Sequence, residues 1–163
     1  MPNLPAGQDS EYVAPTHLTA AAGGRGGSWY VLLEGLASLI HEICPALTIT
    51  VVEGGGVLNH ALVGAGQLPI ALIATLEGLG WTAAYLPAGA YGIVAEPIAT
   101  VAMGTSLGFH ASVPTDVVFA ITRALCEHPE RVRDIHPAAT QFDPAPASLQ
   151  AGGALHPGAE RYF

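Results

Sequence analysis

The sequence predicts an α/β fold in which helices cover both faces of a mostly parallel sheet of about five strands. Short apolar or β-branched runs alternate with amphipathic helical patterns, and a glycine cluster follows each of the first two runs. The chain of 163 residues is long enough for one domain with a core and too short for two ordinary ones. We therefore expect a three-layer sandwich in a single domain.

The first half of the chain has the pattern of a βαβαβ unit. Its predicted elements follow in the order strand 17–22, helix 32–43, strand 47–52, helix 57–63 and strand 68–73. Pro45 ends the first helix because proline cannot continue one. Such units give parallel strands through right-handed crossovers, and ligands bind at the carboxyl ends of those strands. Both glycine clusters, 23–27 and 54–56, fall at that edge.

The second half predicts strands and then helices. The elements are strand 81–86, a turn over 87–92, an apolar strand 98–103 that can extend to Phe109, a helix from Pro114, a short helix 129–135 and a closing segment 156–163. Residues 1–15 have little periodicity and contain three prolines, so we expect a loose leader there. The single lobe is expected over residues 16–163.

Composition excludes some classes of partner. The formal net charge is −8 and there is no lysine, so neither nucleic acid nor an anionic membrane is expected as a partner. A small anion is not excluded, because helix N-termini and glycine-rich backbone bind anions without lysine. With only 11% charged residues, the surface favours self-association, and a homodimer is expected. Cys44 and Cys126 are simplest as reduced thiols, since spacing alone assigns no disulfide.

Three segments together resemble a known family. They are GGRGGSWY at 23–30, TVVEGGGVLN at 50–59 and LHPGAERYF at 155–163, and they occur in the family's order. The chain resembles the TAXI family, the extracytoplasmic solute-binding proteins associated with TRAP transporters. The resemblance implies one lobe of a type II periplasmic binding protein. The second lobe of the family is absent between about residues 74 and 81.

The resemblance also implies a function. Members of the family capture a small organic acid anion, an amino acid or another carboxylate, for a TRAP-type transporter. The implied partners are that carboxylate and the transporter's membrane subunits, and the implied location is periplasmic or extracytoplasmic. No signal peptide is visible in the N-terminal residues, so a cytoplasmic location stays open. No cofactor is implied.

The candidate ligand-binding residues lie in the two glycine turns and the helix starts that follow them. They are Gly24, Arg25, Gly26, Gly27, Ser28, Trp29, Tyr30, Gly55, Gly56 and Asn59. Glycines let backbone N–H groups converge on an anion. Arg25 offers a charge-assisted donor, and Ser28 offers a hydroxyl near the helix start. The other interpretation is that the first cluster is a tight turn, with Ser28 as a helix cap and the aromatic rings as packing.

Two other classes of function remain open from the sequence. A small hydrolase could use Ser28, Ser38, Ser106, Ser112 or Ser148 with the seven histidines, but none of these serines lies in a G-x-S-x-G elbow. A self-associating remnant that binds no ligand is the other. Metal binding is not expected, because pairs such as His41 with Cys44, or His128 with His136, lack further ligands at a familiar spacing.

Overall fold

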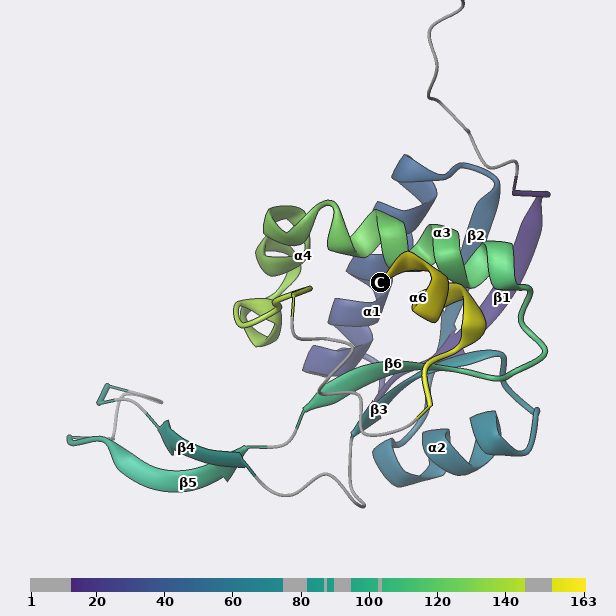
Figure 1. Cartoon of the computed structure of the whole chain (residues 1–163). Helices are drawn as coiled ribbons and strands as arrows, with labels where there is room; N and C mark the ends of the chain where they lie inside the picture. The colour runs from purple at the N-terminus through teal and green to yellow at the C-terminus, as the bar shows by residue number, and fades with distance from the viewer. Residues whose placement is uncertain (1–12, 75–81, 87, 90–94, 103, 146–153) are drawn as a thin grey trace, which may run out of the picture.

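A four-stranded mixed sheet is the centre of the molecule (Figure 1). The computed structural model describes residues 13–74, 82–86, 88–89, 95–102, 104–145 and 154–163. The strand order is β2 (Leu47–Val52), β1 (Thr16–Ala21), β3 (Ile70–Ala74) and β6 (Thr105–Phe109). β1 is parallel to both β2 and β3, whereas β6 is antiparallel to β3. The predicted α/β fold with a mostly parallel sheet, like a single lobe of a periplasmic binding protein, is confirmed.

Helices lie on both faces of this sheet (Figure 1). One face is covered by α1 (Ser28–Ile43) and α3 (Thr115–Cys126). The short helix α4 (Pro129–Ile135) and the 3₁₀ turn η2 (Pro137–Ala139) follow α3 and pack against α1. The C-terminal helix α6 (Pro157–Tyr162) packs against α3. On the other face lies α2 (Gly56–Gly64), which packs against β3. The predicted three-layer arrangement is therefore present.

The main core lies between the sheet and the helix pair α1 and α3. The predicted apolar face of α1 is buried, including Leu33 and Ile40 at 2% and 1% exposure. α3 contributes Val118 and Ile121, which are fully buried. Burying each such side chain stabilises the fold by about 1.5–3 kcal/mol. Val13, which lies inside the predicted leader, is also part of this core.

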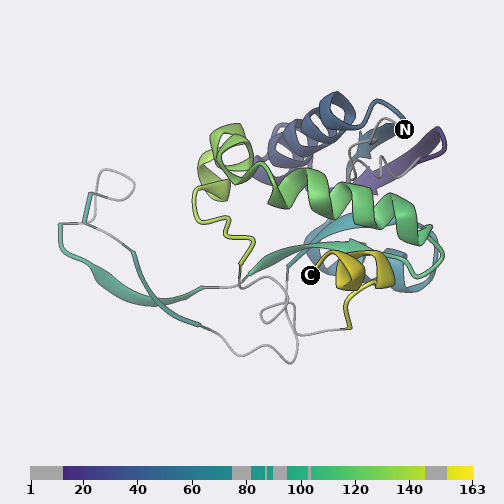
Figure 2. The ribbon, with the colours of Figure 1, turned by 45° about the horizontal axis from the view of Figure 1, so that its top comes forward.

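One predicted strand is divided in the structure. The apolar run expected from Ile98 toward Phe109 forms β5 (Ile98–Ala102) and β6, which pair with different strands. β5 pairs with β4 (Thr82–Leu86) in a two-stranded hairpin that extends away from the main sheet (Figures 1 and 2). The main sheet therefore has four strands, not about five, because the remaining pair continues outward from β3 and β6.

Several predictions concern residues outside the described part of the chain. They include most of the expected leader, Trp81, the junction of the absent second lobe, Ser148 and part of the turn over 87–92, of which Ala88 and Gly89 are described as a turn. Both cysteines are free and half-buried. None of the helices in the described ranges is long and apolar enough to cross a membrane.

Candidate functional site

The two glycine turns lie side by side at the carboxyl ends of β1 and β2. Ala22 donates its N–H to the Val52 carbonyl at 3.2 Å, and Gly54 donates to the Gly23 carbonyl at 3.3 Å, so the parallel pairing continues into the turns. The first turn closes on itself through a 3.0 Å bond from Gly27 N–H to the Gly24 carbonyl. The turn also needs glycine at position 26, where φ is +78°.

The first turn leads directly into α1, whose N-terminus has no side-chain cap. Gly27 is the N-cap residue with extended backbone, and the first turn of the helix contains no acidic residue. The first N–H groups of a helix have no partner within the helix and carry the positive end of its dipole. Ser28 is exposed beside them, whereas Trp29 is half-buried. The geometry is suitable for an anion at this point.

Tyr30 has a largely structural environment. Its side chain is 7% exposed, and its hydroxyl donates to the Val51 carbonyl at 3.4 Å. The Arg25 guanidinium lies 5.9 Å from the centre of the Tyr30 ring, within range of a weak cation–π contact. Tyr30 is therefore mainly part of the core and offers little surface to a ligand.

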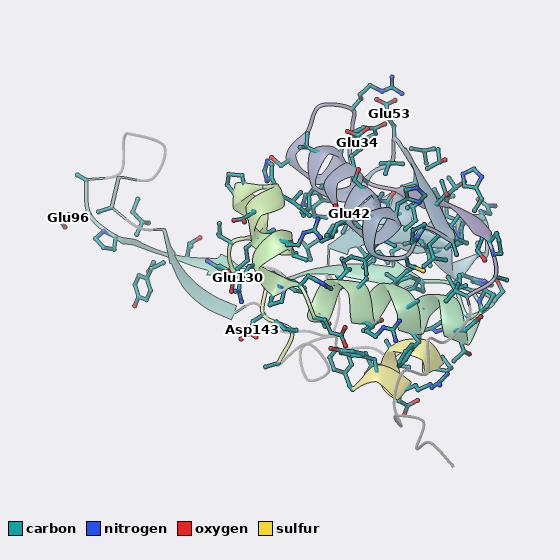
Figure 3. All side chains as sticks on the ribbon, turned by 90° about the horizontal axis from the view of Figure 1, so that it is seen from above. Glu34, Glu42, Glu53, Glu96, Glu130 and Asp143 are labelled. Atoms are coloured by element: carbon teal, nitrogen blue, oxygen red, sulfur yellow. The ribbon has the colours of Figure 1, made fainter. Side chains whose placement is uncertain are left out.

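A carboxylate of the protein already lies at the first turn. Glu53 follows β2 (Figure 3), and its Oε1 accepts the backbone N–H of Arg25 at 3.0 Å. The same oxygen is 4.0 Å from Arg25 Nε, and both side chains are mostly exposed, at 60% and 77%. Exposed pairs of this kind contribute little to stability, so a ligand carboxylate could displace Glu53 at small cost.

Asn59 joins the two turns from below. Its side chain is fully buried, and its amide nitrogen donates to the carbonyls of Ala22 at 2.8 Å and Leu72 at 2.9 Å. Its Oδ1 accepts the Gly55 N–H at 3.0 Å. Both amide hydrogens are thus used within the fold, and the residue connects β1, β3 and the start of α2. It supports the site from inside.

The glycines of the second turn differ in what they require. A Cβ at Gly54 would overlap Asn59 Oδ1 and the Ala22 carbonyl, so glycine is needed there for close packing. Gly55 has open space around it and is the N-cap residue of α2, and Gly56 is the first residue of that helix. The second turn therefore presents another helix N-terminus without a side-chain cap beside the first.

All ten predicted site residues belong to this one edge of the sheet. Sequence analysis missed Glu53 and Gly54. Their signal was present, because Glu53 is the first residue after β2 and opens the second glycine cluster. What the sequence could not give is the bond from Glu53 to a turn 28 residues earlier.

The other candidate chemistries gain no support from the described residues. No group of three His, Cys, Asp or Glu side chains in those ranges could hold a metal ion. The serine–histidine hydrogen bond among the described residues is local: Ser112 Oγ donates to His110 Nδ1 at 2.7 Å, and the same nitrogen accepts the Ser112 N–H. Such a turn lacks the third group that would orient a catalytic base.

Comparison with known families matches residues 75–163 to the NMT1-like family. The chain belongs to the NMT1-like family. This family is of the periplasmic binding-protein type, in agreement with the observed lobe. The NMT1-like match includes the hairpin, β6, α3, α4 and α6, and it begins after β3, so both glycine turns lie outside it. No curated protein matches the chain.

Proposed function

We propose that the chain is a TAXI-type solute-binding protein that captures a small organic acid anion for a TRAP-type transporter. Membership of the NMT1-like family supports a periplasmic substrate-binding role in the broad sense. The observation that carries the finer proposal is the adjacency of two glycine turns, each leading into a helix whose N-terminus has no side-chain cap. Backbone N–H groups arranged in this way bind carboxylates in a protein that has no lysine.

The proposed roles follow from the positions of the residues. The ligand carboxylate accepts from the first N–H groups of α1 and from the Ser28 hydroxyl, where the helix dipole contributes about 0.3–1 kcal/mol. Arg25 swings from Glu53 to the ligand, since the two are held together only by an exposed 4.0 Å pair and one backbone bond. Trp29 forms the apolar wall, together with the small exposed part of Tyr30. Asn59 holds the turns in place without contacting the ligand.

The proposal includes a partner and a location. A receptor of this type passes its ligand to the membrane subunits of a TRAP transporter, so it works outside the cytoplasm. A single lobe covers one side of a ligand, whereas tight small-molecule sites bury most of the ligand surface. We therefore expect weak binding by the isolated lobe, and a screen has to use high ligand concentrations.

The test is a thermal-shift screen against glutamate, 2-oxoacids, short dicarboxylates and aromatic acids. A ligand at 100 times its dissociation constant stabilises the folded state by about 2.7 kcal/mol, which gives a clear shift. The shift should fall in Ser28→Ala, which loses a donor, and in Gly26→Ala, which strains a backbone with φ of +78°. Each variant is compared with its own melting temperature without ligand.

Glu53→Gln is the more discriminating variant, because removing the competing carboxylate should strengthen anion binding. The expected change is about tenfold in affinity, the effect of a charge-assisted hydrogen bond. Asp134→Asn has the same change of charge on an exposed residue of α4 and is the matched control. A folded protein that shows no shift with any acid, in both the parent chain and Glu53→Gln, would contradict the proposal.

A further inference from the structure

The outer edge of β2 has no neighbouring strand among the described residues. β2 has β1 on one side, and no described strand pairs with it on the other. Its sequence, LTITVV, is strongly β-forming and contains no charge, proline or glycine. Natural proteins usually protect exposed edges with charged residues, prolines or bulges. β2 has none of these, so the middle of its edge can accept another strand.

The outward-facing backbone groups of β2 can be assigned from its pairing. The Thr16 N–H at the start of β1 donates to the Ala46 carbonyl at 2.8 Å, and the Ala22 N–H just after β1 donates to the Val52 carbonyl at 3.2 Å. The backbone groups of the even-numbered residues along β2 therefore point toward β1. Backbone direction alternates along a strand. The N–H and C=O of Ile49, in the middle of β2, therefore point away from β1.

Side chains of α1 occupy both ends of this edge. His41 Nδ1 lies 2.8 Å from the Leu47 carbonyl, and the Tyr30 hydroxyl donates to the Val51 carbonyl at 3.4 Å. Both carbonyls belong to odd-numbered residues, which agrees with the assignment. Ile49 lies between them, and its outward groups have no hydrogen-bond partner among the described residues.

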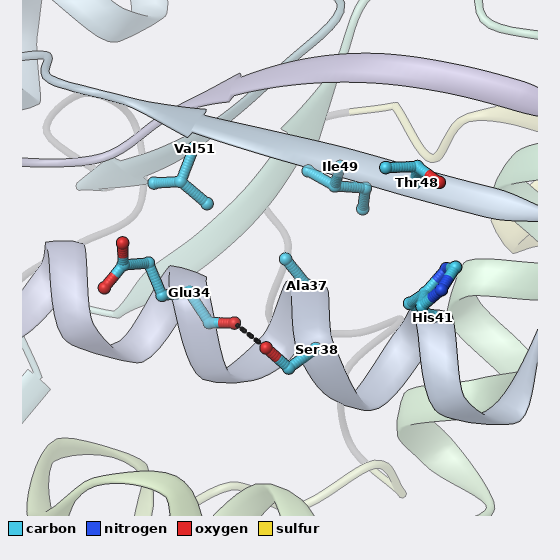
Figure 4. A pocket seen from close by; sticks show the side chains of 7 residues that line it. All are labelled: Glu34, Ala37, Ser38, His41, Thr48, Ile49 and Val51. Carbon is cyan, nitrogen blue, oxygen red and sulfur yellow. Dashed lines mark hydrogen bonds between the residues drawn. The ribbon is translucent and has the colours of Figure 1, made fainter. Parts of the chain in front are cut away.

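A groove runs beside these unpaired groups, between α1 and β2 (Figure 4). Its volume is about 470 Å³. Its walls are Glu34, Ala37, Ser38 and His41 from α1, and Thr48, Ile49 and Val51 from β2. Glu34 lies at the Val51 end and His41 at the Thr48 end, as Figure 4 shows. The groove is therefore acidic at one end and carries an imidazole at the other.

We propose that β2 pairs with β2 of a second copy of this chain, antiparallel about a two-fold axis at Ile49. The two sheets then form one continuous sheet, and the two Ile49 residues exchange both of their outward hydrogen bonds. The axis is perpendicular to the sheet, so α1 of both copies lies on the same face. Side chains of β2 that face the core in one copy must then lie opposite core-facing side chains of β2 in the other copy.

The register through Ile49 satisfies this requirement for every residue of the pair. Leu47 lies opposite Val51 on the core-facing side, and Thr48 lies opposite Thr50 on the other side, so apolar residues meet apolar residues and threonine meets threonine. Cross-strand pairs of both kinds stabilise a sheet. Thr48 and Thr50 are exposed in the isolated lobe. The strand is thus self-complementary in this register.

The positions of His41 and Glu34 also favour a second copy as the occupant. His41 contacts Leu47, and Glu34 lies beside Val51. Because Leu47 lies opposite Val51 across the axis, His41 of each copy is placed near Glu34 of the other, and the contact occurs twice. The formal net charge of −8 opposes contact between copies elsewhere on the surface, whereas β2 itself carries no charge.

The first experiment measures the mass of the full chain without ligand by sedimentation velocity over a range of concentrations in about 0.15 M salt. The expected result is a concentration-dependent shift from the 16.6 kDa monomer to a dimer. Ile49→Pro removes the outward N–H and also replaces a side chain that packs at the border of the core, so the folded state is checked by circular dichroism; the folded variant should be a monomer. Leu58→Ser, at a 57% exposed position on α2, is the control and should still dimerise.

A charge exchange tests the register. Thr48→Lys with Thr50→Lys places two pairs of like charges opposite each other and should weaken the dimer about tenfold or more. Thr48→Glu with Thr50→Lys places opposite charges there and should restore it. The proposal is overturned if the parent chain is monomeric at every concentration. It is also overturned if both double variants dimerise equally. A parent chain whose β2 edge binds an added extended peptide in place of a second copy would overturn it as well.

Discussion

Replacing Asn59 should reveal how strongly one buried side chain holds the candidate site together. Asn59→Leu keeps a similar volume and removes three hydrogen bonds, to Ala22, Leu72 and Gly55. Each bond contributes about 1 kcal/mol, and buried groups left without a partner add a further penalty, so the expected loss is about 3–5 kcal/mol. That is a large part of the 5–15 kcal/mol of an ordinary domain.

The assay is urea denaturation followed by far-ultraviolet circular dichroism. His60→Ala is the control, because His60 is the exposed next residue of the same helix and should change stability by no more than about 0.5 kcal/mol. Asn59→Asp separates polar from packing effects. A carboxylate facing two carbonyl oxygens is unfavourable, whereas a protonated carboxyl can donate to one, so this variant should be relatively more stable near pH 4 than near pH 7.

The reasoning would be refuted if Asn59→Leu lost less than about 1 kcal/mol, because the three bonds would then be dispensable. A loss in Asn59→Asp that is the same at both pH values would show that packing, not hydrogen bonding, sets the requirement. Either result would also remove the reason for Asn59 to be a supporting residue in the proposed ligand site.

Three further predictions concern other parts of the lobe. Gly158→Ala should weaken the packing of α6 on α3, because a Cβ at this position would overlap the backbone of α3. The expected cost is about 1–3 kcal/mol, and faster proteolysis of the C-terminus would report it. The hydrogen bond and charge of Arg131 lower the pKa of Glu42, so this pair stabilises the fold above the ordinary carboxyl pKa of 4.5 and is lost as the pH falls below it. Glu42→Gln should therefore flatten the melting temperature against pH on the acid side, and an unchanged profile would contradict this. Burial raises the pKa of the Cys126 thiol. Iodoacetamide should therefore alkylate Cys126 more slowly in the folded chain than in the denatured chain at the same pH. Equal rates of alkylation would contradict this prediction.

Local patterns were sufficient for the elements of the first half. The apolar spacing from Leu32 to Ile43 predicted the buried face of α1, and the β-branched run at 47–52 gave the bounds of β2. The same signals could not divide the run from Ile98 to Phe109, because the apolar pattern is equal on both sides of the break. Which strand pairs with which depends on β3 and β4, and that information is not local.

The candidate site was predictable in position but less so in detail. Glycines after β1 and β2 had to meet at one edge, since parallel neighbours end on the same side of a sheet. That Asn59 turns inward was not predictable, because an early helical asparagine can equally face solvent. Nor could it show that Glu53 reaches Arg25, since the partners are far apart in the chain and the contact is set by the pairing of β1 with β2.

The two halves of the chain form one folding unit, and this bears on how the family match extends to the site. β6 of the matched half pairs with β3, and α3 packs on α1 through the main core. Arg131 of α4 bonds Glu42 at the end of α1. The NMT1-like segment therefore completes the same sheet and core that hold the glycine turns, although the match stops short of them. The family match and the proposed ligand site therefore lie in different halves of the sequence but on the same sheet.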